Sequence, residues 1–175
     1  NVKSKAQELI FRGADNVYVV DYPELTNFLD EPYTKILVNL IRKHRPEVFL
    51  CGATFIGRAL VSRVAVKLHT GLTADCTELD IDPEEKILLQ TRPAFGGNIL
   101  ATIVCGDHRP QMATVRPGVM KKLPRDPSRT GTIENLSIEL EASDFNTQVI
   151  DIIESPTEHA NLEDSKIIVS GGRGM

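Results

Sequence analysis

A short apolar run in the first third of the chain constrains the fold more than any other feature. Residues 47–51, EVFLC, show almost no alternation of apolar and polar side chains. A strand with one solvated face alternates, whereas a parallel strand covered on both faces does not. The run therefore predicts a parallel strand that is buried on both sides.

The segments around this run alternate between helical and strand-like patterns. Helical periodicity covers residues 4–12, 32–45 and 56–69, and a β-branched and aromatic run at 16–21 predicts a further strand. Gly71 stands where the third helix would be capped. The inner face of that helix is predicted to carry Leu60, Val61, Val64, Ala65 and Leu68. This order of elements predicts a doubly wound α/β fold.

The pattern changes after residue 73. Strand-like runs at 87–91, 99–104 and 112–115 follow one another too closely to be joined by crossover helices. We therefore expect them to pair antiparallel. Two more strand-like runs are expected within residues 133–153. The predicted fold class is α/β, with a mostly parallel sheet and an antiparallel extension.

The expected domain organisation has three parts. Residues 1–154 are predicted to form an α/β domain, and the abrupt start of the sequence suggests that the first strand of this domain is missing. Residues 155–165 are polar and acidic and are expected to be a linker. Residues 166–175, KIIVSGGRGM, are predicted to be a strand and a glycine-rich turn that open a second domain.

Composition excludes several classes of partner. The net charge is −4, with both signs mixed along the chain, whereas a nucleic-acid surface needs clustered basic residues. No apolar run approaches the roughly 20 residues of a membrane span. Cys51, Cys76 and Cys105 are far apart and lack a CxxC motif. Small buried side chains in a reducing cytoplasm explain them better than a disulfide or a metal site.

Three Arg-Pro pairs lie within thirty positions, at Arg92, Arg109 and Arg116. Proline stiffens the backbone beside each cation. The pairs are interpreted either as a rigid cationic rim that faces an anionic ligand or a partner chain, or as charges that solvate the edge of a sheet.

Three other motifs have two interpretations each. The turn at residues 52–57 either binds a nucleotide or is a tight turn that needs small residues, since it matches neither common phosphate-binding motif. The glycine-rich stretch at 170–174 is either a phosphate-binding turn or an ordinary loop. The acidic residues of 75–82 could serve acid–base chemistry or bind a cation, but their spacing favours one solvated face; they are Asp75, Glu78, Asp80 and Asp82.

Taken together, five motifs of the chain closely resemble the α subunit of electron transfer flavoprotein. They are GATFIGR (52–58), GLTADCTEL (71–79), TRPAFGGNILATI (91–103), RPQMATVRPGV (109–119) and VSGGRGM (169–175). The resemblance runs in order over nearly the whole chain. It implies a Rossmann-like domain of the adenine-nucleotide-hydrolase type, followed by a C-terminal FAD domain of which only the first strand and turn are present.

The resemblance also implies a function and cofactor contacts. The expected protein is an electron-carrier subunit rather than a stand-alone enzyme. It is expected to pair with a β subunit in the cytoplasm and to dock on a flavin dehydrogenase of the acyl-CoA type. Arg173 is expected to contact the FAD of the C-terminal domain, and Gly171, Gly172 and Gly174 to shape the turn. Because most of that domain is absent, the chain alone is expected to bind this FAD poorly.

A finer resemblance concerns RPAFGGN and VRPGV. These match the FixB-like branch found in anaerobes and nitrogen fixers, which includes flavin-bifurcating members with a second FAD on the β subunit. Arg92, and secondarily Arg116, are candidates to contact that flavin and to stabilise its anionic reduced form. Bifurcation would couple NADH oxidation to reduction of ferredoxin. The alternatives are an ordinary shuttle with one FAD and an adenine-nucleotide-binding stress or signalling module.

Overall fold

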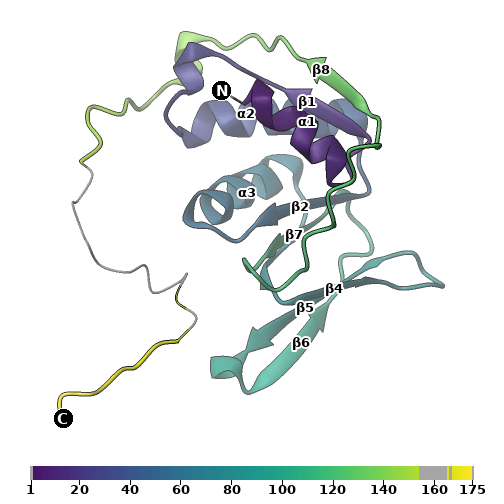
Figure 1. Ribbon diagram of the computed structural model, residues 1–175, viewed down its shortest axis with the longest axis vertical. Coiled ribbons are helices and arrows are strands. Elements are labelled where there is room, and N and C mark those ends of the chain that lie inside the picture. The colour runs from purple at the N-terminus through teal and green to yellow at the C-terminus, as the bar shows by residue number, and fades with distance from the viewer. Residues whose placement is uncertain (1, 154–164, 166, 175) are drawn as a thin grey trace.

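The computed structural model describes residues 2–153, 165 and 167–174 (Figure 1). The regular elements in chain order are α1 Lys3–Phe11, β1 Asn16–Val19, η1 Pro23–Leu25, α2 Asp30–His44, β2 Val48–Gly52, α3 Phe55–Leu68, β3 Leu72–Cys76, β4 Glu78–Ile81, β5 Leu88–Ala94, η2 Phe95–Gly97, β6 Ile99–Ile103, β7 Gln111–Val115, β8 Thr132–Asn135 and η3 Ala142–Asp144. The alternation of helices and strands up to α3 confirms the prediction for the first seventy residues. Mostly parallel sheets with an antiparallel sheet beside them confirm the predicted α/β class.

The helix ends follow from local chemistry. In α2, acidic Asp30 and Glu31 occupy the first turn and basic side chains the last, which suits the helix dipole at both ends. The Thr54 hydroxyl caps α3 by accepting a hydrogen bond from the Gly57 N–H at 3.0 Å. The predicted cap at Gly71 is wrong, because α3 ends at Leu68 and His69 takes the left-handed conformation with φ 55°.

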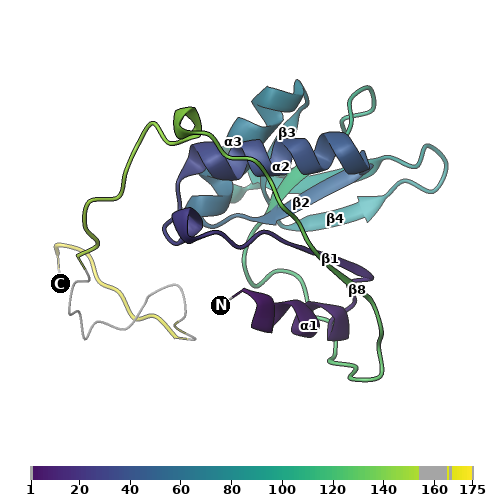
Figure 2. The same cartoon turned by 90° about the horizontal axis from the view of Figure 1, so that it is seen from above.

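The main core lies between the two long helices and the sheet β2-β7-β3 (Figure 2). Its buried members are Val38, Ile41, Leu60, Val61, Val64, Ala65 and Met112. Four of the five positions predicted for the inner face of α3 belong to it, and Leu68 packs against it half-buried. The 3.6-residue period of α3 therefore located this face correctly.

The strand at 47–51 is parallel, as predicted, but it is not buried on both faces. Within the part of the chain that the structure describes, β2 pairs with β7 alone. Phe49 and Cys51 pack against the helical core, whereas Leu50 between them is 48% exposed. Because successive side chains of a strand point to opposite faces, the helices cover one face of β2 and leave the other open.

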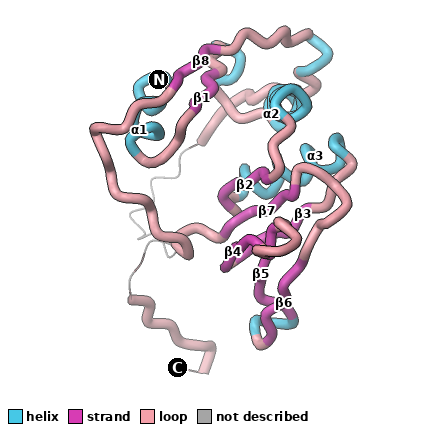
Figure 3. Tube along the Cα trace, turned by 90° about the vertical axis from the view of Figure 1, so that its right-hand side faces the viewer, coloured by secondary structure: helices cyan, strands magenta, loops and turns pink. Residues whose placement is uncertain are grey.

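The prediction of antiparallel pairing holds for only part of the second half. β4, β5 and β6 form an antiparallel sheet in that order (Figure 3). β7, however, is parallel and lies between β2 and β3. The three antiparallel strands themselves carry the chain back to the start of β7, so a parallel connection is made here without a helix. The rule that short spacings exclude parallel pairing fails for this reason.

A second small parallel sheet joins the two ends of the α/β region. β1 pairs with β8, which lies more than a hundred positions later in the sequence. Ala6 and Ile10 of α1 pack on Val17 and Val19 of β1 in a separate buried cluster. One of the two strands expected within 133–153 is therefore present.

One further strand prediction is wrong, and the one for residues 166–175, expected to open a second domain, stays a prediction. Residues 146–153 contain no strand, and Ile150 is 95% exposed. Residues 167–174 contain none either, and Val169 is 93% exposed. Apolar runs form strands only where another strand supplies hydrogen bonds, and these segments lie apart from the sheets in Figures 1 and 2. The expected linker at 155–165 lies, except for residue 165, outside the described residues.

Among the described residues, no helix has the length and apolarity to cross a membrane.

Candidate functional site

A cluster of charged side chains gathers where parallel strands β2, β7 and β3 end. Asp75 lies near the end of β3, and Arg116 follows β7 directly. Arg58 belongs to the first turns of α3, which follows β2. Carboxyl ends of parallel strands share one edge of a sheet, and ligands of α/β proteins commonly bind there. We call Arg58, Asp75, Arg92 and Arg116 the arginine cluster.

Asp75 is the centre of this cluster. Arg116 donates to its carboxylate from Nη2 to Oδ2 at 2.6 Å and from Nε to Oδ1 at 3.3 Å. Arg58 Nη2 donates to Oδ1 at 3.2 Å. The Asp75 N–H donates to the Thr114 hydroxyl at 2.9 Å, and the residue has φ 62°. A backbone bond and a left-handed conformation thus turn this carboxylate toward two arginines.

The electrostatics follow from this geometry. The hydrogen bond from Arg116 is the main cause that lowers the pKa of Asp75, and the charges of Arg116, Arg58 and Arg92 act in the same direction against burial. The same hydrogen bond raises the pKa of Arg116. One carboxylate faces three guanidinium groups, so the arginine cluster keeps an excess of positive charge.

Arg92 reaches the cluster from the antiparallel sheet. The end of β3 is tied to β5 by a hydrogen bond from the Thr77 N–H to the Thr91 carbonyl at 2.9 Å. The Nε atom of Arg92 is buried and has no hydrogen-bond partner among the described residues. The same holds for both amide atoms of Gln90, which is 1% exposed and two residues earlier on the same strand. These atoms are covered by the chain itself, and they are exceptions to the rule that buried polar atoms are bonded.

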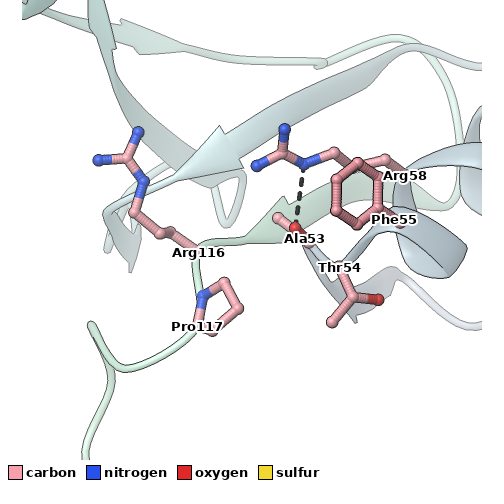
Figure 4. Close-up of a pocket in the computed structure, with 6 residues that line it drawn as sticks. All are labelled: Ala53, Thr54, Phe55, Arg58, Arg116 and Pro117. Carbon is pink, nitrogen blue, oxygen red and sulfur yellow. Dashed lines mark hydrogen bonds between the residues drawn. The ribbon is translucent and has the colours of Figure 1, made fainter. Parts of the chain in front are cut away.

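A pocket of about 450 Å³ opens beside the cluster (Figure 4). It is lined by Ala53, Thr54, Phe55, Arg58, Arg116 and Pro117. Figure 4 shows Arg58 and Arg116 reaching from different elements to the same side, and Arg58 Nε donates to the Ala53 carbonyl at 3.0 Å. The Phe55 ring is 91% exposed. The arrangement suits an anion next to a flat ring.

The tight-turn interpretation of residues 52–57 is also supported. A Cβ added to Gly57 would lie 2.0 Å from the Gly52 carbonyl oxygen, so no larger residue fits. This close approach brings the start of α3 against the end of β2, and it is what places Arg58 over the Ala53 carbonyl. A tight turn and a binding pocket are therefore compatible at this position.

The three Arg-Pro pairs do not form one rim. Arg92 and Arg116 both belong to the arginine cluster. Arg109 lies before β7, at the opposite end of that strand, where its Nε donates to Glu47 Oε2 at 2.6 Å. Arg109 precedes β7 and Arg116 follows it. Because a strand is extended, its length holds these two residues at opposite ends of the sheet.

The prediction that Asp75 shares a solvated face with the acidic residues after it is wrong. Glu78 and Asp80 are exposed, and Asp82 accepts hydrogen bonds from the turn that follows it. Asp75 is turned away from them by its left-handed backbone. No spacing rule identifies such a residue, although Asp is among the types that tolerate this conformation.

The glycine-rich stretch at the C-terminus is not brought to the cluster. Gly171, Gly172, Arg173 and Gly174 are exposed, and an added Cβ at Gly172 or Gly174 would meet nothing within 4 Å. Their expected contact with FAD stays a prediction.

The cysteines are free thiols with different surroundings. Cys76 is fully buried, while Cys51 and Cys105 are half-buried. Burial raises the pKa of Cys51 and of Cys76, so these two thiols are poor nucleophiles. Across the described residues there is no group of three side chains that could hold a metal ion.

Comparison with known proteins gives a consistent family. Residues 1–141 match the model of the electron transfer flavoprotein domain. The chain is 54% identical over its whole length to the electron transfer flavoprotein subunit alpha of Thermoanaerobacterium thermosaccharolyticum, of which it covers 53%. It is 43% identical to Protein FixB of Azotobacter vinelandii, over 96% of the chain and 47% of that protein.

A third relative carries a more specific name. The chain is 42% identical over its whole length to the lactate dehydrogenase (NAD(+),ferredoxin) subunit LctC of Acetobacterium woodii, and covers 41% of it. The chain therefore spans about half the length of the curated relatives it matches.

Proposed function

Because the chain belongs to the electron transfer flavoprotein family, we propose that it is part of an α subunit that carries electrons between a β-subunit flavin and a flavin dehydrogenase. The observation that carries this proposal is the match over the full chain to relatives named as such α subunits. The protein would form a heterodimer with the β subunit in the cytoplasm. It would act as an electron-carrier subunit rather than as an enzyme alone.

Flavin supplies the redox chemistry of such a protein when bound, since it accepts and donates electrons. Two parts of this chain would face flavins. Arg173, with Gly171, Gly172 and Gly174, would belong to the FAD site of the C-terminal domain. Arg92, and secondarily Arg116, would face the FAD of the β subunit. The positive charge of Arg92 lies close enough to act on Asp75 and Cys76 at the end of β3, which places a cation at this end of the sheet.

The role of the cluster follows from its charge. A flavin ring gains negative charge on reduction, and a fixed cation lowers the free energy of the charged form. Arg92 is the first candidate for this contact and Arg116 the second. Asp75 would hold Arg116 in place rather than touch the flavin.

We further propose that the protein takes part in electron bifurcation, coupling NADH oxidation to the reduction of ferredoxin and of an organic acceptor. The names of two relatives support this, since one is a FixB protein and another a dehydrogenase subunit named for NAD(+) and ferredoxin. The organic acceptor would be handled by a dehydrogenase of the acyl-CoA type. An ordinary shuttle with one FAD is the second candidate. The family match weighs against the stress-module alternative.

The test is the Arg92→Ala variant of the heterodimer. Loss of one cation near the ring should make the reduction potential of the β-bound flavin more negative, on the order of 50 mV for one electron, since about 59 mV corresponds to a tenfold change in equilibrium constant. Arg109→Ala removes an arginine of the same motif at the far end of β7 and serves as the control. Equal potentials in Arg92→Ala and the unmodified protein would contradict this role of Arg92.

A further inference from the structure

The pocket beside the arginine cluster has features that electron transfer by the protein does not explain. It combines two partly exposed arginines with a phenylalanine ring that projects almost fully into solvent. The side chains of Arg58 and Arg116 are 55% and 46% exposed. Phe55 is 91% exposed, so its ring is free to contact a bound molecule. The pocket volume of about 450 Å³ is within the range of small-molecule sites.

Hydrogen bonds hold the guanidinium groups of Arg58 and Arg116 in place but do not use all of their donors. Arg58 uses Nε for the Ala53 carbonyl and Nη2 for Asp75. Arg116 uses Nε and Nη2 for Asp75. Among the described residues, the Nη1 atom of neither arginine donates a hydrogen bond. Each guanidinium is therefore held in direction by existing bonds and still offers donors to an incoming group, which reduces the entropy lost on binding.

The local charge is opposite to that of the whole chain. The chain has a net charge of −4, while this edge of the sheet places Arg58, Arg92 and Arg116 around the single carboxylate of Asp75. An excess of cations in an acidic protein attracts anions to one place. Guanidinium groups bind phosphate with paired, charge-assisted hydrogen bonds.

The position of the pocket adds a third argument. It lies at the carboxyl ends of parallel strands β2 and β7 and next to the first turn of α3. The N-terminal end of a helix carries partial positive charge and unpaired N–H groups. The turn that leads into α3 is tight, since a Cβ added to Gly57 would lie 2.0 Å from the Gly52 carbonyl oxygen. Phosphates bind in this setting in many α/β proteins.

From these features we propose that the pocket binds the phosphate groups of a nucleotide, with Arg58 and Arg116 holding phosphate oxygens and the Phe55 ring stacking on the base. Aromatic side chains stack on any base, because every base has a flat face. This site is lined by residues of this chain alone, and it shares Arg116 with the second candidate contact of the β-subunit flavin. It assigns Arg116 to a phosphate and leaves Arg92 as the candidate for the flavin. The inference does not depend on the electron-transfer proposal.

The test uses the complete subunit purified with its partner and resident cofactors, titrated by calorimetry with inorganic pyrophosphate and, separately, with ADP. We expect saturable binding of both probes. Arg58→Gln and Arg116→Gln should each weaken both about tenfold, since a hydrogen bond to a charged group contributes about 1.5 kcal/mol or more. Arg109→Gln, at the other end of β7, should leave both affinities unchanged.

A second variant separates phosphate from base recognition. Phe55→Ala should weaken ADP about fivefold or more, since stacking on a base contributes about 1–3 kcal/mol, and should leave pyrophosphate unchanged. Circular dichroism and thermal melts of each variant check that the fold is kept. Absence of saturable binding, equal affinity in Arg58→Gln and the unmodified protein, or equal weakening by Arg109→Gln would overturn the site. Equal loss of both probes in Phe55→Ala would overturn the role of the ring.

Discussion

Arg116 Nη2 and Asp75 Oδ2 lie 2.6 Å apart, although the two residues are 41 positions apart in the sequence. The contact spans the ends of adjacent parallel strands β7 and β3. It exists because β7 returns through an antiparallel sheet to lie between β2 and β3, and because Asp75 adopts a left-handed backbone. The arginine cluster is thus a product of chain topology.

The first prediction concerns this pair. Asp75→Asn keeps the shape of the side chain and removes its charge, leaving Arg116 and Arg58 without their shared partner. We expect the free energy of unfolding to fall by about 1 kcal/mol, a value at the upper end for partly exposed ion pairs. Urea denaturation measures it.

The matched control is Glu47→Gln, which breaks the ion pair with Arg109. The Glu47 side chain is 79% exposed, so its loss should change stability very little. Equal destabilisation by the two variants would show that Asp75 is no more important than a surface charge.

The second prediction is a dependence of stability on pH. Arg116 lowers the pKa of Asp75 in the fold below its ordinary value of 3.8. A carboxyl group with a lowered pKa stabilises the fold above its unfolded pKa, and this stabilisation is lost as the pH falls through the folded pKa. The unmodified protein should therefore lose more stability than Asp75→Asn as the pH falls from roughly 5 through the folded pKa of Asp75. The free energy of unfolding of both proteins is measured by urea denaturation at each pH. An equal decrease in the two proteins at low pH would contradict this prediction.

The third prediction tests the turn that positions Arg58. Gly57→Ala would place a Cβ 2.0 Å from the Gly52 carbonyl oxygen, and overpacking against backbone should destabilise the protein by about 3 kcal/mol or more. Gly52→Ala is the control, since its Cβ would meet only the Thr54 methyl group at 4.0 Å. Thermal denaturation compares them, and similar melting temperatures for the two variants would show that the turn is wider than described.

The fourth prediction concerns the core face of α3. Val61 is fully buried, whereas Val66 on the same helix is 73% exposed. Val61→Ala should lower the free energy of unfolding by about 2 kcal/mol through lost burial and a small cavity. Val66→Ala should change it by less than about 0.5 kcal/mol. A reversed order in urea denaturation would mean that α3 packs through another face.

Much of the first half of the fold was predictable because helix periodicity and helix signals act locally. The buried face of α3 is an example. The exposure of Leu50 was not predictable, since it depends on what covers the second face of β2. The parallel pairing of β7 was missed because a rule about connection length assumes that helices make parallel crossovers. The exposed runs around Ile150 and Val169 show that β propensity alone forms no strand.

The candidate site was predictable in its residue types and not in its assembly. The Arg-Pro motif predicts Arg92 and Arg116 as site residues. The same motif also includes Arg109, which the chain topology places at the other end of β7. The sequence does not reveal that Asp75 and Arg58 belong to one cluster, because the spacing of Asp75 is typical of an acidic face and Arg58 stands out only within a family motif. Side chains from separate elements meet through strand order, which local patterns do not encode.

The most direct test of the electron-transfer proposal is a count of cofactors. The complete α subunit would be purified together with its β partner, its cofactors released with acid, and FAD and AMP counted per heterodimer. The proposal predicts flavin in the complex, and bifurcation predicts two FAD and no AMP. One FAD with one AMP would instead support the ordinary shuttle. A complex without any flavin would contradict the central claim.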